Sequence, residues 1–378
     1  MTIVGTRPEL IKMCRVIEEF DRHTNHVLVH TGQNYDYELN QIFFEDLGIR
    51  KPDYFLNAAG KNASQTIAKV IERSDEILEQ ECPQAILLYG DTNSCLSVIA
   101  AKRRKIPVFH MEAGNRCFDE RVPEELNRKV VDHLSDINMV LTEHARRYLM
   151  AEGKRPETIF KTGSHMQEVL THYRGKIEDS SILNKLRLAA DRYLLVSLHR
   201  EENVDAPDSL RLIVETLDHL SQVFDMPIVV STHPRTRKRL DEMPYIRLPE
   251  TVQFLKPFGF FDYIKLQTKA FCVISDSGTI TEESSLLGFP AVTIREMHER
   301  PEGFDAGTLI MSGLGKDSTE KAIKVIRSQK FDQANPDHRF ADQFGRVEDY
   351  ESSFPSRQIL RIVLSYTDYV NRVVWRKN

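Results

Sequence analysis

Short apolar runs alternate with segments of helical periodicity along almost the whole chain. The apolar runs are rich in Val, Ile and Leu and end at Gly, Asp, His or Ser. Continuous apolar strands of this kind are typical of parallel sheets that helices cover on both faces. The alternation therefore predicts an α/β fold with doubly wound parallel sheets.

The candidate strands form two series along the chain. The first series consists of Thr2–Val4, His26–His30, Ala85–Tyr89, Pro107–His110, Ile137–Thr142 and Thr158–Thr162. The second series consists of Tyr193–Leu198, Pro227–Ser231, Val252–Leu255, Phe271–Ser275 and Pro290–Ile294. Each series suffices for a sheet of its own, so we predict two Rossmann-like domains.

A polar stretch at residues 164–190 separates the two series and lacks strand character. We place an N-terminal domain at residues 1–164 and a C-terminal domain at residues 165–352. Apolar residues at helical spacing in residues 353–378 predict a last helix that packs back on the N-terminal domain. We expect the domains to face each other across a cleft, because ligands bind beyond the carboxyl ends of parallel strands.

Composition excludes several classes of protein. The chain of 378 residues has 51 basic and 56 acidic residues, so bulk positive charge for nucleic acid is absent. No apolar run approaches the ~18 residues of a membrane span, and no signal peptide opens the chain. We therefore expect a cytoplasmic enzyme that contacts neither nucleic acid nor membrane.

Cofactor motifs are also missing from the sequence. The five cysteines are scattered without a CxxC pair, which indicates neither a disulfide framework nor a zinc site. The GxGxxG fingerprint does not follow the first strand, which disfavours a nicotinamide mechanism. We expect no cofactor and no metal.

Acidic residues follow the strands of the first series. Asp91 follows Ala85–Tyr89, Glu112 follows Pro107–His110, and Glu125 lies in the first turn of a helix predicted to begin at Pro123. Taken singly, Asp91 could cap a helix and Glu125 could balance a helix dipole. Because parallel strands end at one edge of a sheet, the acids converge there, which favours proton transfer.

Phosphate-binding features occur in both domains. Arg7 and Lys12 lie near a helix N-terminus, and the turn Ser277–Thr279 offers main-chain N–H groups and hydroxyls to an anion. Solvated cations and a plain capped helix are the structural alternatives. His199, at a strand end, could contact a diphosphate, transfer a proton or be structural. Together these features favour a nucleotide-diphosphate ligand for a nucleotide-sugar epimerase, a hydrolase or a glycosyltransferase.

The motifs that carry these residues recur in one known family. They are GTRPELIK, TGQNYDYEL, YGDTNS, HMEAGNRCFDERVPEELNR, LTEHARRYL, KTGS, LHREENV, STHPRT, ISDSGTITEES and REMHERPEGFDAGT. This set resembles the non-hydrolysing UDP-N-acetylglucosamine 2-epimerase family, and the similarity runs from about residue 2 to residue 312. The resemblance implies a glycosyltransferase-B type of fold, a homodimer and a UDP-sugar as the ligand, with neither nicotinamide nor metal.

The resemblance also implies roles for single residues. Asp91, Glu112 and Glu125 match the family's acid/base carboxylates, and His199 matches a histidine that contacts the diphosphate and matters for turnover. The positions that match nucleotide-binding residues are Arg7, Lys12, Ser277, Gly278, Thr279, Glu283 (ribose) and Arg300, with Phe258 or Tyr263 on the uracil side. Closely spaced carboxylates raise one another's pKa, so we expect them to supply an acid near neutrality.

Within the family, four segments are most similar to the C-2 epimerases that form UDP-N-acetyl-L-fucosamine. They are TGQNYDYELN, YGDTNSCL, NRCFDERVPEELNR and SLHREENVD. The similarity implies epimerisation of UDP-2-acetamido-2,6-dideoxy-L-talose through a 2-acetamidoglycal, for capsule or O-antigen synthesis. The alternatives are UDP-N-acetylglucosamine or UDP-2,3-diacetamido-2,3-dideoxyglucuronate as substrate, a retaining glycosyltransferase of the same fold, and a non-catalytic nucleotide-sugar binder.

Overall fold

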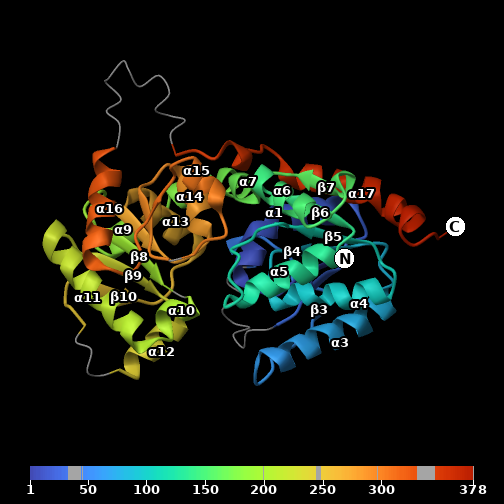
Figure 1. The fold of residues 1–378 in the computed structure, drawn as a ribbon, viewed down its shortest axis with the longest axis horizontal. Coiled ribbons are helices and arrows are strands. Elements are labelled where there is room, and N and C mark those ends of the chain that lie inside the picture. The colour runs from blue at the N-terminus through green and yellow to red at the C-terminus, as the bar shows by residue number, and fades with distance from the viewer. Residues whose placement is uncertain are drawn as a thin grey trace, which may run out of the picture. The chain divides into compact units, whose positions relative to one another are not determined.

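The computed structural model describes residues 1–32, 44, 46–198, 200–243, 248–295, 297–329 and 345–377. The chain forms two compact units (Figure 1). Unit 1 consists of Met1–Thr171 with Asp349–Asn378, and unit 2 of His172–Glu348. The chain thus changes unit at 171/172 and at 348/349, whereas the sequence places the boundaries at 164/165 and 352/353.

Unit 1 is built on a parallel sheet with the strand order β3-β2-β1-β4-β5-β6-β7. Its strands are β1 Thr2–Val4, β2 Leu28–His30, β3 Tyr54–Phe55, β4 Ile86–Tyr89, β5 Val108–Met111, β6 Ile137–Val140 and β7 Ile159–Lys161. The chain winds outward in both directions from the adjacent strands β1 and β4. Loops that leave such a pair at the carboxyl edge separate to opposite faces of the sheet and leave room for a ligand.

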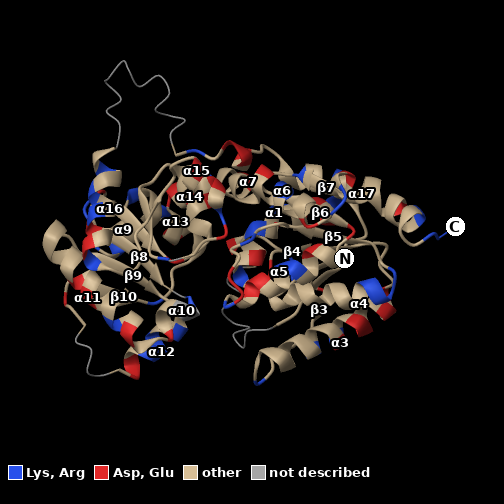
Figure 2. Ribbon diagram, viewed as in Figure 1, with Lys and Arg blue, Asp and Glu red and all other residues tan. Residues whose placement is uncertain are grey.

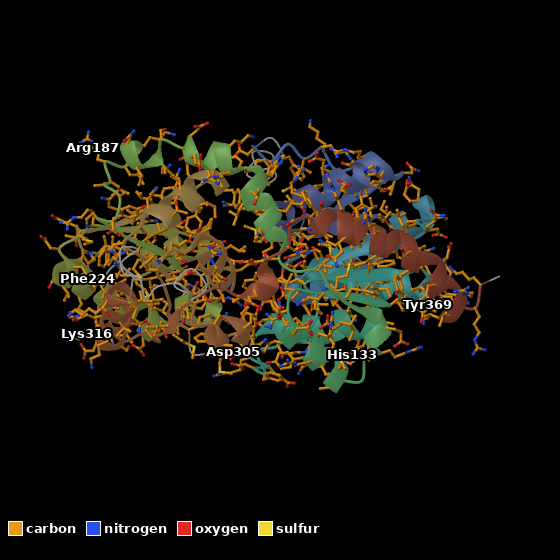
Figure 3. All side chains as sticks on the ribbon, turned by 90° about the horizontal axis from the view of Figure 1, so that it is seen from above. His133, Arg187, Phe224, Asp305, Lys316 and Tyr369 are labelled. Atoms are coloured by element: carbon orange, nitrogen blue, oxygen red, sulfur yellow. The ribbon has the colours of Figure 1, made fainter. Side chains whose placement is uncertain are left out.

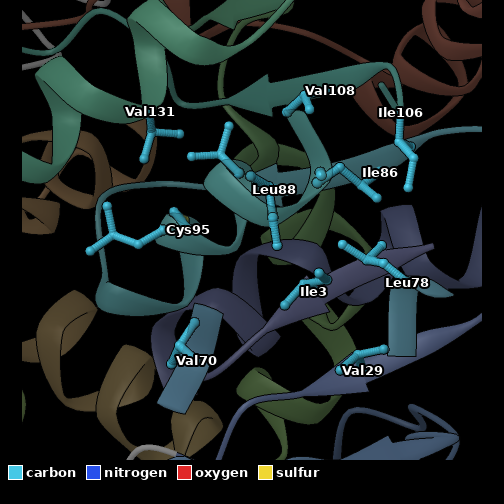
Figure 4. Packing of buried hydrophobic residues seen from close by; sticks show 14 of the residues in the cluster. Ile3, Val29, Val70, Leu78, Ile86, Leu88, Cys95, Ile106, Val108 and Val131 are labelled. Atoms are coloured by element: carbon cyan, nitrogen blue, oxygen red, sulfur yellow. The ribbon is translucent and has the colours of Figure 1, made fainter. Parts of the chain in front are cut away.

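Alternate strand residues of unit 1 build a core with α3 (Ala63–Glu81) and α5 (Pro123–Leu134). Ile3, Ile86 and Leu88 point from the sheet toward this face, and Val70 of α3 and Val131 of α5 meet them (Figure 4). All five side chains are at least 99% buried. The period of two along the strands explains why every second strand residue joins one layer of the core.

The other helices of unit 1 complete its layers. They are α1 Arg7–His23, α4 Val98–Arg103, α6 Glu143–Ala151, α7 His165–His172 and α17 Pro355–Val373, with a 3₁₀ turn at Asn93–Ser97. Helix α17 packs against α1, so the last helix, red in Figure 1, returns to the unit in which the chain begins. Of the apolar residues that predicted this helix, α17 buries Ile359, Leu360, Ile362, Val363 and Val370, whereas Val373 is exposed.

Unit 2 is built on a second parallel sheet with the strand order β10-β9-β8-β11-β12-β13. Its strands are β8 Leu194–Leu198, β9 Ile228–Thr232, β10 Val252–Leu255, β11 Cys272–Ser275, β12 Ala291–Thr293 and β13 Ile310–Met311. Here the winding reverses between β8 and β11, so the loops after these strands lie at the position that suits a ligand.

Helices cover both faces of the second sheet. They are α8 Arg174–Glu178, α9 Ile182–Lys185, α10 Glu201–Val204, α11 Pro207–Phe224, α12 Pro234–Asp241, α13 Phe260–Lys269, α14 Thr279–Leu287, α15 Pro301–Asp305 and α16 Lys316–Ser328. Leu194 and Val196 face α11 and α16, whereas Leu195 between them faces α13 and α14. Charged residues of both signs lie together on outer helices such as α12 and α16 (Figure 2).

The two-domain α/β fold predicted from the sequence is confirmed. Each predicted strand overlaps a strand of the structure, and the sequence missed only β3 and β13 among the described strands. Both missed strands have two residues and lie at a sheet edge, where periodicity gives too few positions to detect. Among the described helices, none is long and apolar enough to cross a membrane.

Gly114 tests the tight packing of the loop after β5. It has φ +82°, and a Cβ atom there would lie 2.6 Å from the carbonyl oxygen of Ala145. Gly153 has φ +86° but open space around it, so an alanine there would cause backbone strain without a steric clash. We expect Gly114→Ala to lower the free energy of unfolding by about 2–5 kcal/mol and Gly153→Ala by about 1–2. Chemical denaturation measures both values. Equal losses of unfolding free energy in the two variants would contradict the tight contact of Gly114 with Ala145.

Candidate active site

The carboxyl edge of the first sheet carries the three acidic residues that the sequence singles out. Asp91 lies in the loop after β4, Glu112 directly follows β5, and Glu125 lies in the first turn of α5. A Cβ atom on Gly90 would lie 3.8 Å from Oε2 of Glu112, so the loop of Asp91 runs beside the Glu112 carboxylate. The fold therefore brings the three residues to one edge of the sheet.

Arg128, on α5, links two of these carboxylates. Its Nε lies 2.8 Å from Oδ2 of Asp91, and its Nη1 lies 2.8 Å from Oε2 of Glu125. The Arg128 side chain is 4% exposed, and that of Asp91 is 32% exposed. Asn127 supports the same loop, because its Nδ2 donates to the carbonyl oxygen of Asp91 at 2.9 Å. A planar guanidinium can serve two carboxylates at once, which a lysine cannot do in this fixed geometry.

Glu125 is fully buried, and its carboxylate holds the loop that precedes α5. It accepts hydrogen bonds from the main-chain N–H groups of Cys117 (3.1 Å) and Phe118 (3.2 Å). Burial alone would raise the pKa of Glu125, but the hydrogen bonds from Cys117 and Arg128 and the Arg128 charge outweigh burial and lower that pKa. The expectation that neighbouring carboxylates raise one another's pKa is therefore wrong for Glu125, whose nearest charge is a guanidinium.

Glu112 pairs with the first helix. Both of its carboxylate oxygens lie near Nζ of Lys12, at 3.3 and 3.4 Å, and the Lys12 side chain is 5% exposed. Lys12, which the sequence assigns to the nucleotide, thus lies against a predicted acid/base carboxylate. Glu112 also has φ +59°, a backbone conformation that is uncommon outside glycine and often marks functional positions. Arg7 is the first residue of α1 and is half-buried.

Glu9 is a carboxylic acid of this edge that the sequence reasoning missed. Its side chain accepts hydrogen bonds from the Thr92 hydroxyl and from the main-chain N–H groups of Gly5 and Thr6. Burial raises its pKa to about 7; these three hydrogen bonds oppose the rise, and the Asp91 charge adds to it. The spacing of Thr6 and Glu9 is that of a capping box. This pattern in the sequence indicates helix capping and gives no sign of a raised pKa.

The second sheet carries the predicted phosphate-binding turn. Ser277 follows β11, Gly278 is the N-cap of α14, and Thr279 begins the helix. The hydroxyls of Ser277 and Thr279 lie 3.0 Å apart at this helix N-terminus. Main-chain N–H groups and the helix dipole favour an anion in such a position.

Arginine side chains, two of them buried, follow the strands near this turn. Arg200 and Arg295 both bind Glu299, at 3.1 and 2.6 Å, and Oε1 of Glu299 lies so close to Gly278 that a Cβ there would be 2.1 Å away. A carboxylate is thus held beside the turn by two guanidinium groups. Arg300 is 3% exposed and lies 3.6 Å from Oε2 of Glu282. Of these three arginines, the family resemblance assigns only Arg300 to the nucleotide.

The remaining predicted residues lie near the same helix. Glu283 accepts a hydrogen bond of 2.6 Å from Nε2 of Gln267, and Tyr263 contacts Ser197 and Gln267. Burial, followed by the charge of Glu283, raises the pKa of Tyr263. Phe258 and Tyr263 both pack against the core of unit 2. His199 lies outside the described residues.

Comparison with known proteins decides the family. The family model described as UDP-N-acetylglucosamine 2-epimerase matches residues 18–351. The chain belongs to the UDP-N-acetylglucosamine 2-epimerase family. Its members are isomerases, and this chain is therefore a nucleotide-sugar 2-epimerase.

Individual relatives agree with this assignment. A structure named UDP-N-acetylglucosamine 2-epimerase from Rickettsia bellii is 57% identical, with a TM-score of 0.91 over 100% of this chain and 99% of that one. The Methanocaldococcus jannaschii enzyme in complex with UDP-GlcNAc and UDP is 30% identical, with a TM-score of 0.87 over 96% and 99%.

Two further proteins show the range of the family and of the fold. UDP-2,3-diacetamido-2,3-dideoxy-D-glucuronate 2-epimerase of Pseudomonas aeruginosa is 35% identical over 86% of this chain and 91% of its own. A glycosyltransferase from Rickettsia africae shares the fold at 12% identity, with a TM-score of 0.57 over 98% of both chains. The glycosyltransferase-B type of fold expected from the sequence is confirmed. Among the described residues, no group of three or more His, Cys, Asp or Glu could hold a metal ion.

Glu9 gives the site a measurable pH dependence. Its folded-state pKa of about 7 lies above its ordinary value of 4.5, so the folded state binds the proton more tightly than the unfolded state. Its contribution to stability is present below pH 4.5 and is lost as the pH rises through 7. Between pH 5 and 8, the free energy of unfolding of the wild type should fall by about 1–3 kcal/mol relative to that of the Glu9→Gln variant. Denaturant titrations at each pH measure this difference. If the free energies of unfolding of both proteins changed equally with pH, the result would contradict this pKa.

Proposed function

We propose that the chain inverts C2 of a UDP-2-acetamido sugar by eliminating UDP and adding it back. The observation that carries the proposal is the set of acids at the carboxyl edge of unit 1. Asp91 and Glu112 are partly exposed to solvent, and each lies against a cation, Arg128 or Lys12. Carboxylates in such positions can transfer protons to and from a substrate. Unit 1 would supply proton transfer, and unit 2 would hold the nucleotide.

The first step removes the proton at C2, which no adjacent carbonyl acidifies. A carboxylate accepts this proton, the C–H electron pair forms the double bond between C1 and C2, and the C1–O electron pair leaves with UDP. In the second step, a UDP oxygen adds to C1 and a carboxylic acid returns a proton to the opposite face of C2. Atoms and charge balance without a redox cofactor. Water must be kept from the glycal, because hydrolysis would otherwise compete.

Departing UDP carries additional negative charge, and the groups of unit 2 suit it. The turn Ser277–Thr279 offers N–H groups and hydroxyls, while Arg200 and Arg300 supply positive charge. Glu283, which Gln267 holds at 2.6 Å, is our proposed ribose contact, with Phe258 or Tyr263 on the uracil side. Arg7 and His199 stay predicted contacts of the diphosphate.

Burial divides the three acids of unit 1. The Asp91 and Glu112 side chains are 32% and 12% exposed, whereas Glu125 is fully buried with its oxygens engaged by N–H donors. We therefore propose that Asp91 and Glu112 act on the two faces of C2. Glu125 would support them by holding Arg128 and the loop before α5. Glu9, with its pKa of about 7, accepts a hydrogen bond from Thr92, the residue that follows Asp91.

For the substrate, we propose UDP-2-acetamido-2,6-dideoxy-L-talose, which gives UDP-N-acetyl-L-fucosamine for capsule or O-antigen synthesis. Support comes from YGDTNSCL and NRCFDERVPEELNR, which surround Asp91 and Glu125. UDP-N-acetylglucosamine is the second candidate, because the 57% identical protein of R. bellii is named for it. A homodimer and a cytoplasmic location stay predictions.

Proton NMR in D2O tests the reaction and the substrate together. We expect new L-fuco signals with deuterium at C2 when the enzyme meets UDP-2-acetamido-2,6-dideoxy-L-talose, and no change in a parallel tube of UDP-N-acetylglucosamine. Turnover only in the second tube would establish the second candidate. If neither sugar were epimerised but UDP still bound in calorimetry, the result would favour a glycosyltransferase or a non-catalytic nucleotide-sugar binder.

Substitutions test the proposed division among the acids. Asp91→Asn and Glu112→Gln should each lower kcat by about 100-fold or more without a comparable loss of stability, because each removes one proton-transfer group. Glu125→Gln should lower stability as well, because it disturbs a buried ion pair.

Glu120→Gln is the matched control for these substitutions. Its side chain is on the loop that precedes α5, is 87% exposed and pairs with Lys129 at 3.0 Å. It should leave kcat unchanged. Normal turnover by either Asp91→Asn or Glu112→Gln would remove that residue from the proposed chemistry.

A further inference from the structure

His110 lies in β5, two residues before Glu112, and is 1% exposed. Its two ring nitrogens face two different partners. Nδ1 lies 2.8 Å from Oδ1 of Asp132 on α5, and Nε2 lies 2.7 Å from the carbonyl oxygen of Gly90. The imidazole therefore bridges the loop after β4 and the helix that carries Glu125.

Both partners of His110 accept hydrogen bonds and cannot donate them. A peptide carbonyl has no proton to give, and neither does an ionised carboxylate. Asp132 is fully buried, which alone would raise its pKa, but the hydrogen bonds and charges of His110 and Arg116 lower that pKa below its ordinary value. Two acceptors at hydrogen-bond distance require a donor at each nitrogen, and only the imidazolium form has two donors.

The surrounding charges balance a buried imidazolium. Arg116 is also buried, and its Nη1 lies 2.6 Å from Oδ2 of Asp132. Its Nε and Nη2 bind Glu152, the C-cap residue of α6, at 2.8 and 2.6 Å. His133, labelled on α5 in Figure 3, lies 3.1 Å from the same Glu152 and is half-exposed. Arg116 and an imidazolium at His110 would thus face two carboxylates, the arrangement that allows charges to stay ionised away from water.

This network ties together the main chain on which the proposed proton-transfer groups depend. Gly90 immediately precedes Asp91, and its carbonyl is held by His110. Gly114, which follows Glu112 by two residues, donates its N–H to both carboxylate oxygens of Asp132 at 3.2 and 3.1 Å. His110 and Asp132 therefore connect the turn before Asp91 with the turn after Glu112.

We propose that His110 is kept as an imidazolium and is a positioning residue that fixes Asp91 relative to Glu112. The inference rests on the proposed function of these two acids. Loss of either ring proton would set a nitrogen lone pair against the Gly90 carbonyl or the Asp132 carboxylate. The bridge would then break, and the two loops would no longer be held in one arrangement.

His26 provides a matched control next to the same sheet. Its Nδ1 lies 2.6 Å from Oδ1 of Asp21, and its Nε2 lies 2.7 Å from the hydroxyl of Thr2. A hydroxyl can donate as well as accept, so neutral His26 satisfies both contacts. Burial lowers the pKa of His26 to about 4, with the Asp21 hydrogen bond opposing the shift. This histidine precedes β2 and lies at the amino edge of the sheet, away from Asp91 and Glu112.

Nitrogen NMR of the full chain, labelled with ¹⁵N in its histidines, tests the protonation state directly. At pH 7.5, both ring nitrogens of His110 should show the shifts of a protonated imidazolium, and those of His26 should show a neutral tautomer. Loss of one set of signals in His110→Gln assigns the resonances. A neutral shift at either nitrogen of His110 would overturn the imidazolium, whether or not the enzyme turns over a UDP-sugar.

Kinetics and amide shifts test the positioning role. His110→Gln should lower kcat at least tenfold with KM changed less than threefold, and should shift the main-chain amide resonances of Asp91 and Gly114. His26→Gln should change neither. A variant of His110 with wild-type kcat and unmoved amides would overturn the proposal. If wild type turns over no UDP-sugar, the proposed function fails, while the amide shifts still decide whether His110 holds the loops.

Discussion

The contact of Arg128 with Asp91 and Glu125 connects the main parts of the first site. The guanidinium lies 2.8 Å from each carboxylate and reaches from α5 to the loop after β4. Through Glu125 it also secures the loop before α5, because that carboxylate accepts two main-chain N–H groups. Removal of one partner from a buried pair of this kind typically costs about 3–5 kcal/mol, so the interaction constrains fold and site together.

Positively charged side chains influence the protonation state of the acids at this edge. Lys12 lies beside Glu112, Arg128 beside Glu125, and His110 with Arg116 beside Asp132. Burial alone would raise the pKa values of Glu125 and Asp132, but hydrogen bonds, from Cys117 and Arg128 to Glu125 and from His110 and Arg116 to Asp132, lower both values together with these charges. At Glu9 the effect of burial is the largest, and it raises the pKa of this carboxyl to about 7. One edge of a sheet thus carries carboxylates that stay ionised and a carboxyl that titrates near neutrality.

The sequence predicted the architecture well because parallel strands buried on both faces leave a continuous apolar signal. It also placed Asp91, Glu112 and Glu125 at strand or helix ends that the fold brings to one edge. The pairing of Lys12 with Glu112 could not be read from spacing, since 100 residues separate them. Arg128 and His110 were overlooked for the same reason, because their roles arise from partners that only tertiary packing supplies. Edge strands β3 and β13 were too short to leave a periodic pattern.

Positional isotope exchange tests most directly whether the bond between C1 and UDP breaks during epimerisation. The substrate carries ¹⁸O in the bridge between C1 and the β-phosphorus, and ³¹P NMR follows the label in recovered UDP-sugar. Elimination predicts that the label spreads into the non-bridging β-phosphate oxygens while deuterium from solvent enters C2. An epimerised product that retains all of its label in the bridge would contradict elimination.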